Sequence, residues 1–229
     1  MWYRKAAEQG HVNAQSSLGY MYSAGEGVTE DVQQAVFWYT RSSAERGNAE
    51  AQFNAGISYD IGNGVTQDAQ QAVSWYRKAA EQGHAEAQYH LGLRYAHGEG
   101  VTQDAKQAVA WYRKAAEQGH ASAQHNLGVM YYNGEGIAQD PKQAVAWFRK
   151  AAEQGDADAQ FSIGVMYAKG KGVTQDYRQS YVWASVAVAN GYSEGTRLRD
   201  DMAGRLTSAQ LEEAQQLARQ YFERYQPAS

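Results

Sequence analysis

Apolar and polar residues recur with a helical period along residues 84–119. The first half of this stretch carries apolar residues four positions apart, on one face of a helix: Ala87, Leu91 and Tyr95. A Gly-Glu-Gly turn at 98–100 stops that helix, because glycine tolerates the left-handed backbone of a helix end. A second apolar pattern begins after Asp104, a residue type that favours helix N-caps, and ends at Gly119. The stretch therefore predicts two antiparallel helices of about 12–14 residues joined by a short turn.

The same pattern returns along most of the chain. All six tryptophans lie 36 or 37 residues apart: Trp2, Trp38, Trp75, Trp111, Trp147 and Trp183. The phrase WYRKAAEQGH occurs three times without a change, starting at the first, third and fourth of these tryptophans. On this period we divide the chain into five repeats, each a helix pair: 11–47, 48–83, 84–119, 120–155 and 156–191. A period of this length is typical of proteins whose units stack in a row.

Stacking of the repeats predicts the fold class. One helix pair cannot bury its own apolar face, so neighbouring pairs have to cover one another. We therefore expect an all-α protein, a right-handed α-α superhelix (solenoid) of antiparallel helix pairs with a period of 36.

A glycine recurs in the middle of every first helix: Gly19, Gly56, Gly92, Gly128 and Gly164. Each of these glycines costs roughly 0.5–1 kcal/mol relative to alanine in a helix interior. A cost repeated in every unit indicates a compensating contact. We expect a helix of the same or the adjacent repeat to press its backbone or an aromatic ring onto each glycine.

The residues of the third repeat match a known family. Their pattern is A-x-x-x-L-G-x-x-Y, then G-x-G-V, then D-x-x-x-A-x-x-W-Y-x-K-A-A-E-Q-G: Ala87, Leu91, Gly92, Tyr95, Gly98, Gly100, Val101, Asp104, Ala108, Trp111, Tyr112, Lys114, Ala115, Ala116 and Gly119. This pattern resembles the Sel-one-like repeat (SLR) family, a relative of the tetratricopeptide repeat, over residues 1–191. Departures include Ser42-Ser43 in place of the Ala-Ala pair and Ala184 in place of the aromatic residue after Trp183. The resemblance implies a non-enzymatic scaffold or adaptor, often from a bacterium.

Both ends of the chain depart from the repeat. Residues 1–10 read as the second helix of a truncated repeat, which suggests a fragment or a late start within a longer array. Residues 192–229 read as a C-terminal helical cap, with a capping box at Thr207 and Gln210 and an apolar stripe along the helix that follows. Such a helix can cover the last open apolar face. An export signal upstream of Met1 would indicate a periplasmic or secreted protein, and its absence a cytoplasmic one.

Composition narrows the function classes. The net charge of −4 gives no electrostatic reason to expect nucleic acid or an anionic membrane as a partner. The longest largely apolar stretch, Tyr181–Ala189, is far shorter than the ~20 residues of a membrane span. With no cysteine, the chain offers neither disulfides nor thiol chemistry.

Candidate chemistry is sparse. The five G-x-G loops lack the third glycine of a dinucleotide fingerprint and the Gly-Lys-Ser/Thr of a P-loop, so we interpret them as turns between helices. The six histidines show no metal-ligand spacing, and we expect neither a metal nor a cofactor. Some cysteine-rich SLR proteins have been linked to β-lactam binding or hydrolysis. That alternative stays open here by fold analogy alone, since no S-x-x-K, S-D-N or K-T-G element is present.

Comparison of the repeats with one another separates framework from varied positions. The two residues before the leucine of the first helix change from repeat to repeat, as do positions one turn further on. By resemblance, first helices line the concave side of the stack. We predict a groove there that binds a protein or peptide segment, with ten candidate residues: Phe53, Asn54, Tyr89, His90, Arg94, His125, Asn126, Met130, Phe161 and Met166. Two alternatives are that the aromatic residues pack between repeats and that the chain is a structural spacer within a larger array. The sequence does not name the partner or the oligomeric state.

Overall fold

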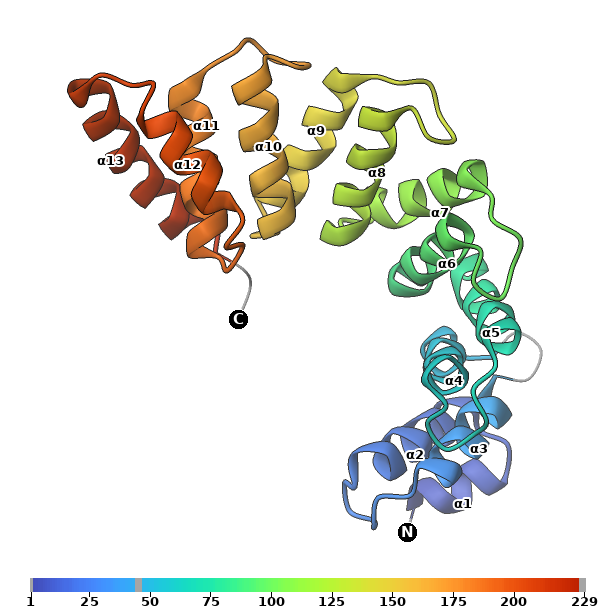
Figure 1. Cartoon of the computed structure of the whole chain (residues 1–229). Coiled ribbons are helices and arrows are strands. Elements are labelled where there is room, and N and C mark those ends of the chain that lie inside the picture. The colour runs from blue at the N-terminus through green and yellow to red at the C-terminus, as the bar shows by residue number, and fades with distance from the viewer. Residues whose placement is uncertain (1, 44–46, 227–229) are drawn as a thin grey trace. The chain divides into compact units, whose positions relative to one another are not determined.

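A computed structural model describes residues 2–43 and 47–226 as helices joined by short connections (Figure 1). The described residues contain thirteen helices and no strand: α1 (Trp2–Glu8), α2 (Val12–Ala24), α3 (Val32–Ser42), α4 (Ala49–Ile61), α5 (Ala69–Glu81), α6 (Ala85–His97), α7 (Ala105–Glu117), α8 (Ala121–Asn133), α9 (Pro141–Ala152), α10 (Ala157–Lys169), α11 (Tyr177–Ala189), α12 (Gly195–Ala203) and α13 (Ser208–Arg224). The predicted all-α class is confirmed.

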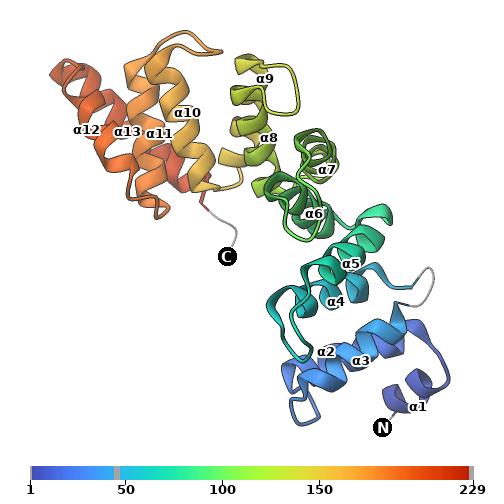
Figure 2. The same cartoon turned by 45° about the vertical axis from the view of Figure 1, so that its right-hand side comes forward.

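The chain divides into two compact units, Met1–Ala115 and Ala116–Ser229. In the first unit α2 packs on α3 and α4 packs on α5, and α5 in turn packs on α6 (Figure 2). In the second unit α8 packs on α9 and α10 on α11, and α9 also packs on α10. Helices α5 and α9 therefore each contact the first helix of their own repeat and that of the next, as the solenoid prediction requires.

Side chains and glycines fix the helix ends where the sequence predicts them. The Asp140 carboxylate accepts hydrogen bonds from the backbone N–H groups of Lys142 and Gln143, at 2.9 and 3.1 Å, and Pro141 occupies the first helical position. At the other end of a first helix, Gly98 adopts a left-handed backbone, with a φ of 74°, and its N–H donates to the Arg94 carbonyl.

Close contacts account for four of the mid-helix glycines. A Cβ added at Gly92 would lie 2.6 Å from Cδ1 of Tyr112, because the tyrosine ring rests directly on the helix backbone. The same ring-on-glycine contact joins three further pairs: Gly19 with Tyr39, Gly56 with Tyr76, and Gly128 with Phe148. The predicted compensating contact is confirmed. At these positions alanine would gain helix propensity and lose the close packing.

The fifth mid-helix glycine meets a different neighbour. Ala184 stands where the other repeats carry the ring, and Leu198 of α12 occupies the space instead. A Cβ added at Gly164 would lie 3.3 Å from Cδ2 of Leu198. Helix α12 thus supplies from outside the repeats the apolar group that the fifth repeat lacks.

Buried glutamines connect successive helices, a feature that the sequence analysis did not predict. Gln88 Nε2 donates to the Ala80 carbonyl at 3.0 Å, from a first helix to the end of the preceding second helix. In the second unit Gln124 bonds the Ala116 carbonyl in the same way, and its Oε1 accepts from Gln154 Nε2 at 2.7 Å. The Gln124 carboxamide therefore bonds both the preceding second helix and the segment that follows α9.

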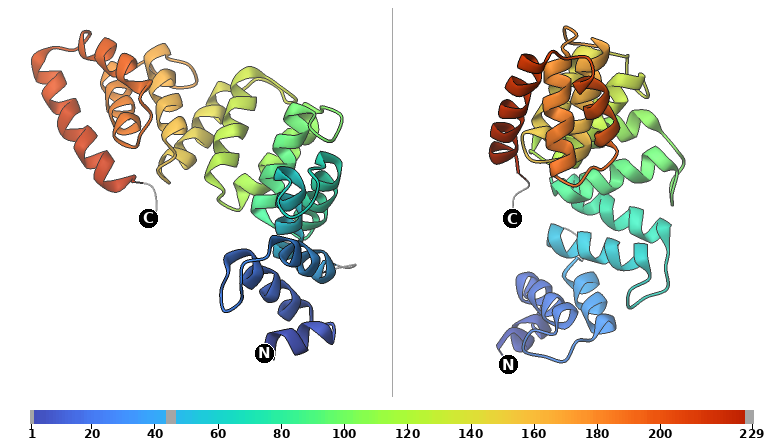
Figure 3. Two further views of the ribbon diagram at one scale, coloured as in Figure 1. Left: turned by 60° about the horizontal axis from the view of Figure 1, so that its bottom comes forward. Right: turned by 60° about the vertical axis from the view of Figure 1, so that its left-hand side comes forward.

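Helices α12 and α13 lie against α11 at the end of the second unit (Figure 3). The ring of Trp183 stacks on Tyr225, with centroids 5.7 Å apart, and meets Tyr221 edge-on at 5.1 Å. The predicted capping box of Thr207 and Gln210 is present at the start of α13. At the other end of the chain, α1 packs on α2.

Candidate binding surface

All ten predicted binding residues lie on first helices: Phe53 and Asn54 on α4; Tyr89, His90 and Arg94 on α6; His125, Asn126 and Met130 on α8; Phe161 and Met166 on α10. Eight of them are half-buried: Phe53, Asn54, Tyr89, His90, Arg94, His125, Asn126 and Phe161. We call the surface formed by the side chains of α2, α4, α6, α8 and α10 outside the core the first-helix face. Because the chain forms two units, this face is described within each unit separately.

Two of the ten residues do not belong to an open surface. Met130 and Met166 are 6% and 2% exposed and pack in the core of their repeats. Both lie one position beyond a Leu-Gly-x or Ile-Gly-x segment, where a small rotation of the helix decides between core and surface. Their selection as surface residues was wrong, because the repeat comparison detects variation and variation also occurs inside a core.

Arg94 stands at the position of these methionines and has charged partners. Its guanidinium pairs with Asp60 of the preceding repeat and with Glu99 of its own loop. The Asp60 carboxylate also accepts a hydrogen bond from the Tyr76 hydroxyl at 3.1 Å. Burial, followed by the Asp60 carboxylate, raises the pKa of the Tyr76 phenol. Arg94 therefore joins two repeats through a largely buried ion pair.

The ring of Phe53 packs between repeats. It stacks on the imidazole of His84, with centroids 4.9 Å apart, and contacts His90 at 5.4 Å and Tyr76 at 5.8 Å. Two rings of the next repeat and one ring of its own second helix therefore surround Phe53. The contacts of Phe53 are therefore those of the alternative in which the aromatic residues pack between repeats.

Equivalent rings in the other repeats make similar contacts. Tyr89 lies 6.1 Å from the ring of Tyr112, and Phe161 stacks on Tyr192 at 4.9 Å. His125 lies 5.5 Å from the ring of Phe148, and its Nε2 is 3.3 Å from Oγ of Ser162 on the next first helix. These rings pack against the second helices or the following segment, and each of the three residues Tyr89, His125 and Phe161 stays half-buried.

His84 and His120 cap helices. The Nδ1 atoms of the two imidazoles accept the backbone N–H of Ala87 and Ala123, each at 3.2 Å. Asn48 and Asp156 make the same bond with their side chains in other repeats. The sequence analysis missed this cap, since histidine is not among the preferred N-cap residues.

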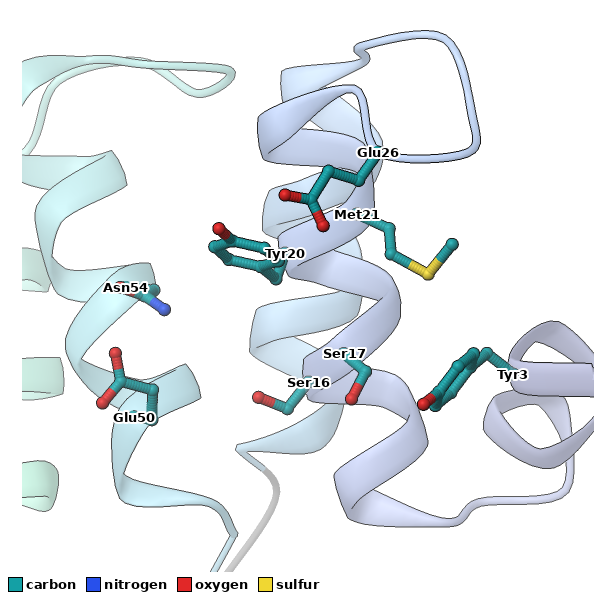
Figure 4. A pocket seen from close by; sticks show the side chains of 8 residues that line it. All are labelled: Tyr3, Ser16, Ser17, Tyr20, Met21, Glu26, Glu50 and Asn54. Atoms are coloured by element: carbon teal, nitrogen blue, oxygen red, sulfur yellow. The ribbon is translucent and has the colours of Figure 1, made fainter.

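A pocket of about 510 Å³ opens on the first-helix face of the first unit. It lies between α2 and α4, with Tyr3 of α1 at its edge (Figure 4). Its lining residues are Tyr3, Ser16, Ser17, Tyr20, Met21, Glu26, Glu50 and Asn54. The varied positions of the first repeat supply four of them, yet only Asn54 was among the ten predicted residues. Because the pocket forms between two first helices, a comparison of single repeats could not locate it.

Phosphate-binding loops, metal ligands and membrane-spanning helices would be other signs of function among the described residues. In the five G-x-G loops the second glycine can lie against the preceding repeat. A Cβ on Gly100, for example, would be 2.2 Å from the Ala69 carbonyl oxygen. Among the described residues no group of three or more His, Asp or Glu side chains could hold a metal ion. Nor does any described helix combine the length and the apolar character of a membrane span.

Comparisons with known proteins agree with the repeat pattern. The Sel1 repeat profile matches six segments: residues 1–11, 12–46, 49–84, 85–120, 121–156 and 157–192. No curated protein matches the chain.

Two solved structures are similar over most of the chain. A Sel1 repeat protein from Oxalobacter formigenes shares 35% identity, with a TM-score of 0.78 over 93% of this chain and 86% of that one. A protective antigen of uropathogenic Escherichia coli strains with an SLR fold shares 37% identity, with a TM-score of 0.64 over 98% of this chain. The present chain spans only 56% of that antigen.

Proposed function

Because the chain belongs to the Sel1 repeat family, whose units match most of its length, we propose that this repeat scaffold binds an extended peptide segment of a partner protein along the first-helix face of one unit. The second helices α3, α5 and α9 each pack on two first helices. First helices keep half-buried side chains that differ between repeats, and a surface of that kind can recognise a peptide through alternate pockets.

The pocket between α2 and α4 carries this proposal. Its volume of about 510 Å³ falls in the range of about 300–1,000 Å³ that small-ligand sites occupy. Tyr20 is 53% exposed, so an aromatic ring is available for contact. Exposed tyrosines next to polar groups are typical of binding hot spots. A plain structural spacer would not require an open pocket on this face.

Selection of peptides tests the proposal. A phage library of random linear 12-residue peptides is panned against the whole chain, and the affinity of enriched peptides is measured by fluorescence anisotropy. We expect enriched peptides whose Kd rises about tenfold in the double variant N54A/N126A, which removes two half-buried carboxamides from α4 and α8. Absence of any enriched peptide would contradict peptide binding and favour a spacer.

A matched control separates the two sets of helices. The double variant Q71A/Q107A removes two exposed carboxamides from α5 and α7, which are second helices. We expect it to bind the enriched peptides as the wild type does. Loss of binding in Q71A/Q107A, with N54A/N126A unaffected, would move the site to the second helices.

A further inference from the structure

Four of the five repeats place a ring at one position of the first helix: Phe53, Tyr89, His125 and Phe161. In the second and fifth repeats this ring contacts a ring of the segment that follows the repeat. Phe53 of α4 stacks on His84 and meets His90 of α6, and Phe161 of α10 stacks on Tyr192. The ring therefore fills the space beside the neighbouring helix.

The first repeat lacks this ring. Ser16 occupies the position, and the pocket opens at this place between α2 and α4. Figure 4 shows the Ser16 hydroxyl and the Tyr20 ring on the α2 side, with Glu50 and Asn54 facing them from α4. The cavity is thus the space that a phenylalanine would fill in the second and fifth repeats.

The pocket is acidic and aromatic. Glu26 and Glu50 contribute carboxylates, Tyr20 contributes an exposed ring, and none of the described lining residues is basic. A carboxylate and an aromatic face together attract a cation, and guanidinium groups suit both because they are planar and form paired hydrogen bonds.

His84 positions one of the carboxylates. Its Nδ1 accepts the Ala87 N–H, so in the neutral imidazole the proton is on Nε2, which lies 2.9 Å from Oε2 of Glu50. This bond uses one oxygen of Glu50, and among the described residues none occupies the other, which can bind a ligand. The positioned carboxylate, the ring of Tyr20 and the side chain of Asn54 converge on one space (Figure 4).

We infer that this pocket binds an arginine side chain of the partner peptide. The inference rests on the proposed function, because it names the side chain that the first-helix face recognises at its first repeat. Tyr3 is not needed for it, since Ser16, Tyr20, Glu50 and Asn54 already surround the space.

Titration with N-acetyl-arginine amide, followed by amide NMR of the whole chain, tests the pocket directly. We expect shift changes concentrated at Ser16, Tyr20, Glu50 and Asn54, and at least about fivefold weaker binding in E50Q. The matched control E86Q changes the equivalent position of α6, and we expect it to bind as the wild type does. N-acetyl-glutamine amide, which carries no charge, should cause none of these changes. Equal changes with both compounds, or changes elsewhere, would overturn the inference.

The variant S16F closes the pocket with the ring that the second and fifth repeats already carry. We expect it to keep the helical circular dichroism spectrum and to lose arginine binding. If S16F instead unfolds, S16L fills the same space with a smaller apolar group and should give the same loss of binding. Undiminished arginine binding in a folded S16F or S16L would overturn the inference.

The peptide selection distinguishes failure of the pocket from failure of the proposed function. Enriched peptides that share an arginine and lose affinity in S16F support the inference. Enriched peptides without a basic residue, unaffected by S16F, would overturn the arginine pocket and leave peptide binding intact. If no peptide is enriched, peptide binding fails as a function, and the NMR titration still decides whether the pocket takes the guanidinium group.

Discussion

At the scale of single residues, the sequence predicted those contacts that recur in every repeat. Mid-helix glycines implied a closely packed neighbour, and four of them carry a ring of the second helix. Contacts made once could not be predicted in this way. Arg94 and Asp60 are 34 positions apart, and nothing in either local sequence indicates that they pair. The His84 cap was missed for a different reason, because histidine is an uncommon cap.

The variant G92A tests the ring-on-glycine contact. The new methyl group would lie 2.6 Å from the Tyr112 ring, and overpacking of this kind costs about 1–3 kcal/mol. That cost exceeds the gain of roughly 0.5–1 kcal/mol in helix propensity. We expect a lower urea midpoint than that of the wild type. G164A is the matched control, because its nearest neighbour is the flexible end of Leu198 at 3.3 Å. A G92A variant more stable than the wild type would contradict the account.

The variant R94M tests the ion pair between repeats. It installs the methionine of the fourth and fifth repeats but leaves the Asp60 carboxylate, whose side chain is 13% exposed, without its cation. Breaking a buried pair in this way costs about 3–5 kcal/mol. The triple variant D60A/Y76F/R94M leaves only the exposed Glu99 carboxylate without its cation, and we expect most of the stability to return. Equal loss in both variants, measured by urea unfolding, would show that the charges themselves do not matter.

The buried phenol of Tyr76 predicts a pH dependence. Burial and the Asp60 carboxylate raise the pKa of Tyr76 above its ordinary value of 10.0. The folded chain therefore holds the proton at pH values where the unfolded chain releases it, so this contribution to stability is present below pH 10 and is lost as the pH rises above it. We expect the free energy of unfolding to fall less steeply above pH 10 in Y76F than in the wild type. Identical slopes would remove Tyr76 as a cause.

At the scale of elements, the sequence predicted helix pairs, their capping residues and the helix that begins after Thr207. It did not predict that α12 would carry Leu198 onto Gly164 in place of the missing ring, because that contact joins a non-repeat segment to the last repeat. We propose from these contacts that residues 192–229 cap the array. Tyr221 of α13 and Tyr225, which directly follows that helix, cover Trp183 of the final second helix.

The variant A218D tests whether α13 covers the end of the stack. Ala218 is 8% exposed and packs in a cluster with Val182 and Met202, so an aspartate there would bury a charge without a partner. We expect a loss of about 3 kcal/mol or more and increased binding of a dye that reports exposed apolar surface. Q216D places the same charge on the exposed side of α13 and should behave as the wild type. A stable A218D variant would contradict the packing of α13.

At the scale of the whole molecule, the period of 36 predicted the all-helical repeat fold, and the residue pattern of the third repeat resembled the SLR family. The Sel1 repeat profile and the solved relatives confirm both. The candidate site was predicted less well. The prediction that first helices bind a partner stays a prediction, Met130 and Met166 are buried, and the pocket beside Ser16 was not foreseen. The pocket opens where Ser16 replaces the ring that the other repeats carry. That a missing ring leaves a cavity follows only from the positions of the two adjacent helices in the structure.

Amide hydrogen exchange with and without an enriched peptide tests the central claim most directly, because it reports which helices a bound peptide covers. The account predicts slower exchange in α2, α4 and other first helices, with α3 and α5 unchanged. Protection confined to the second helices would contradict it.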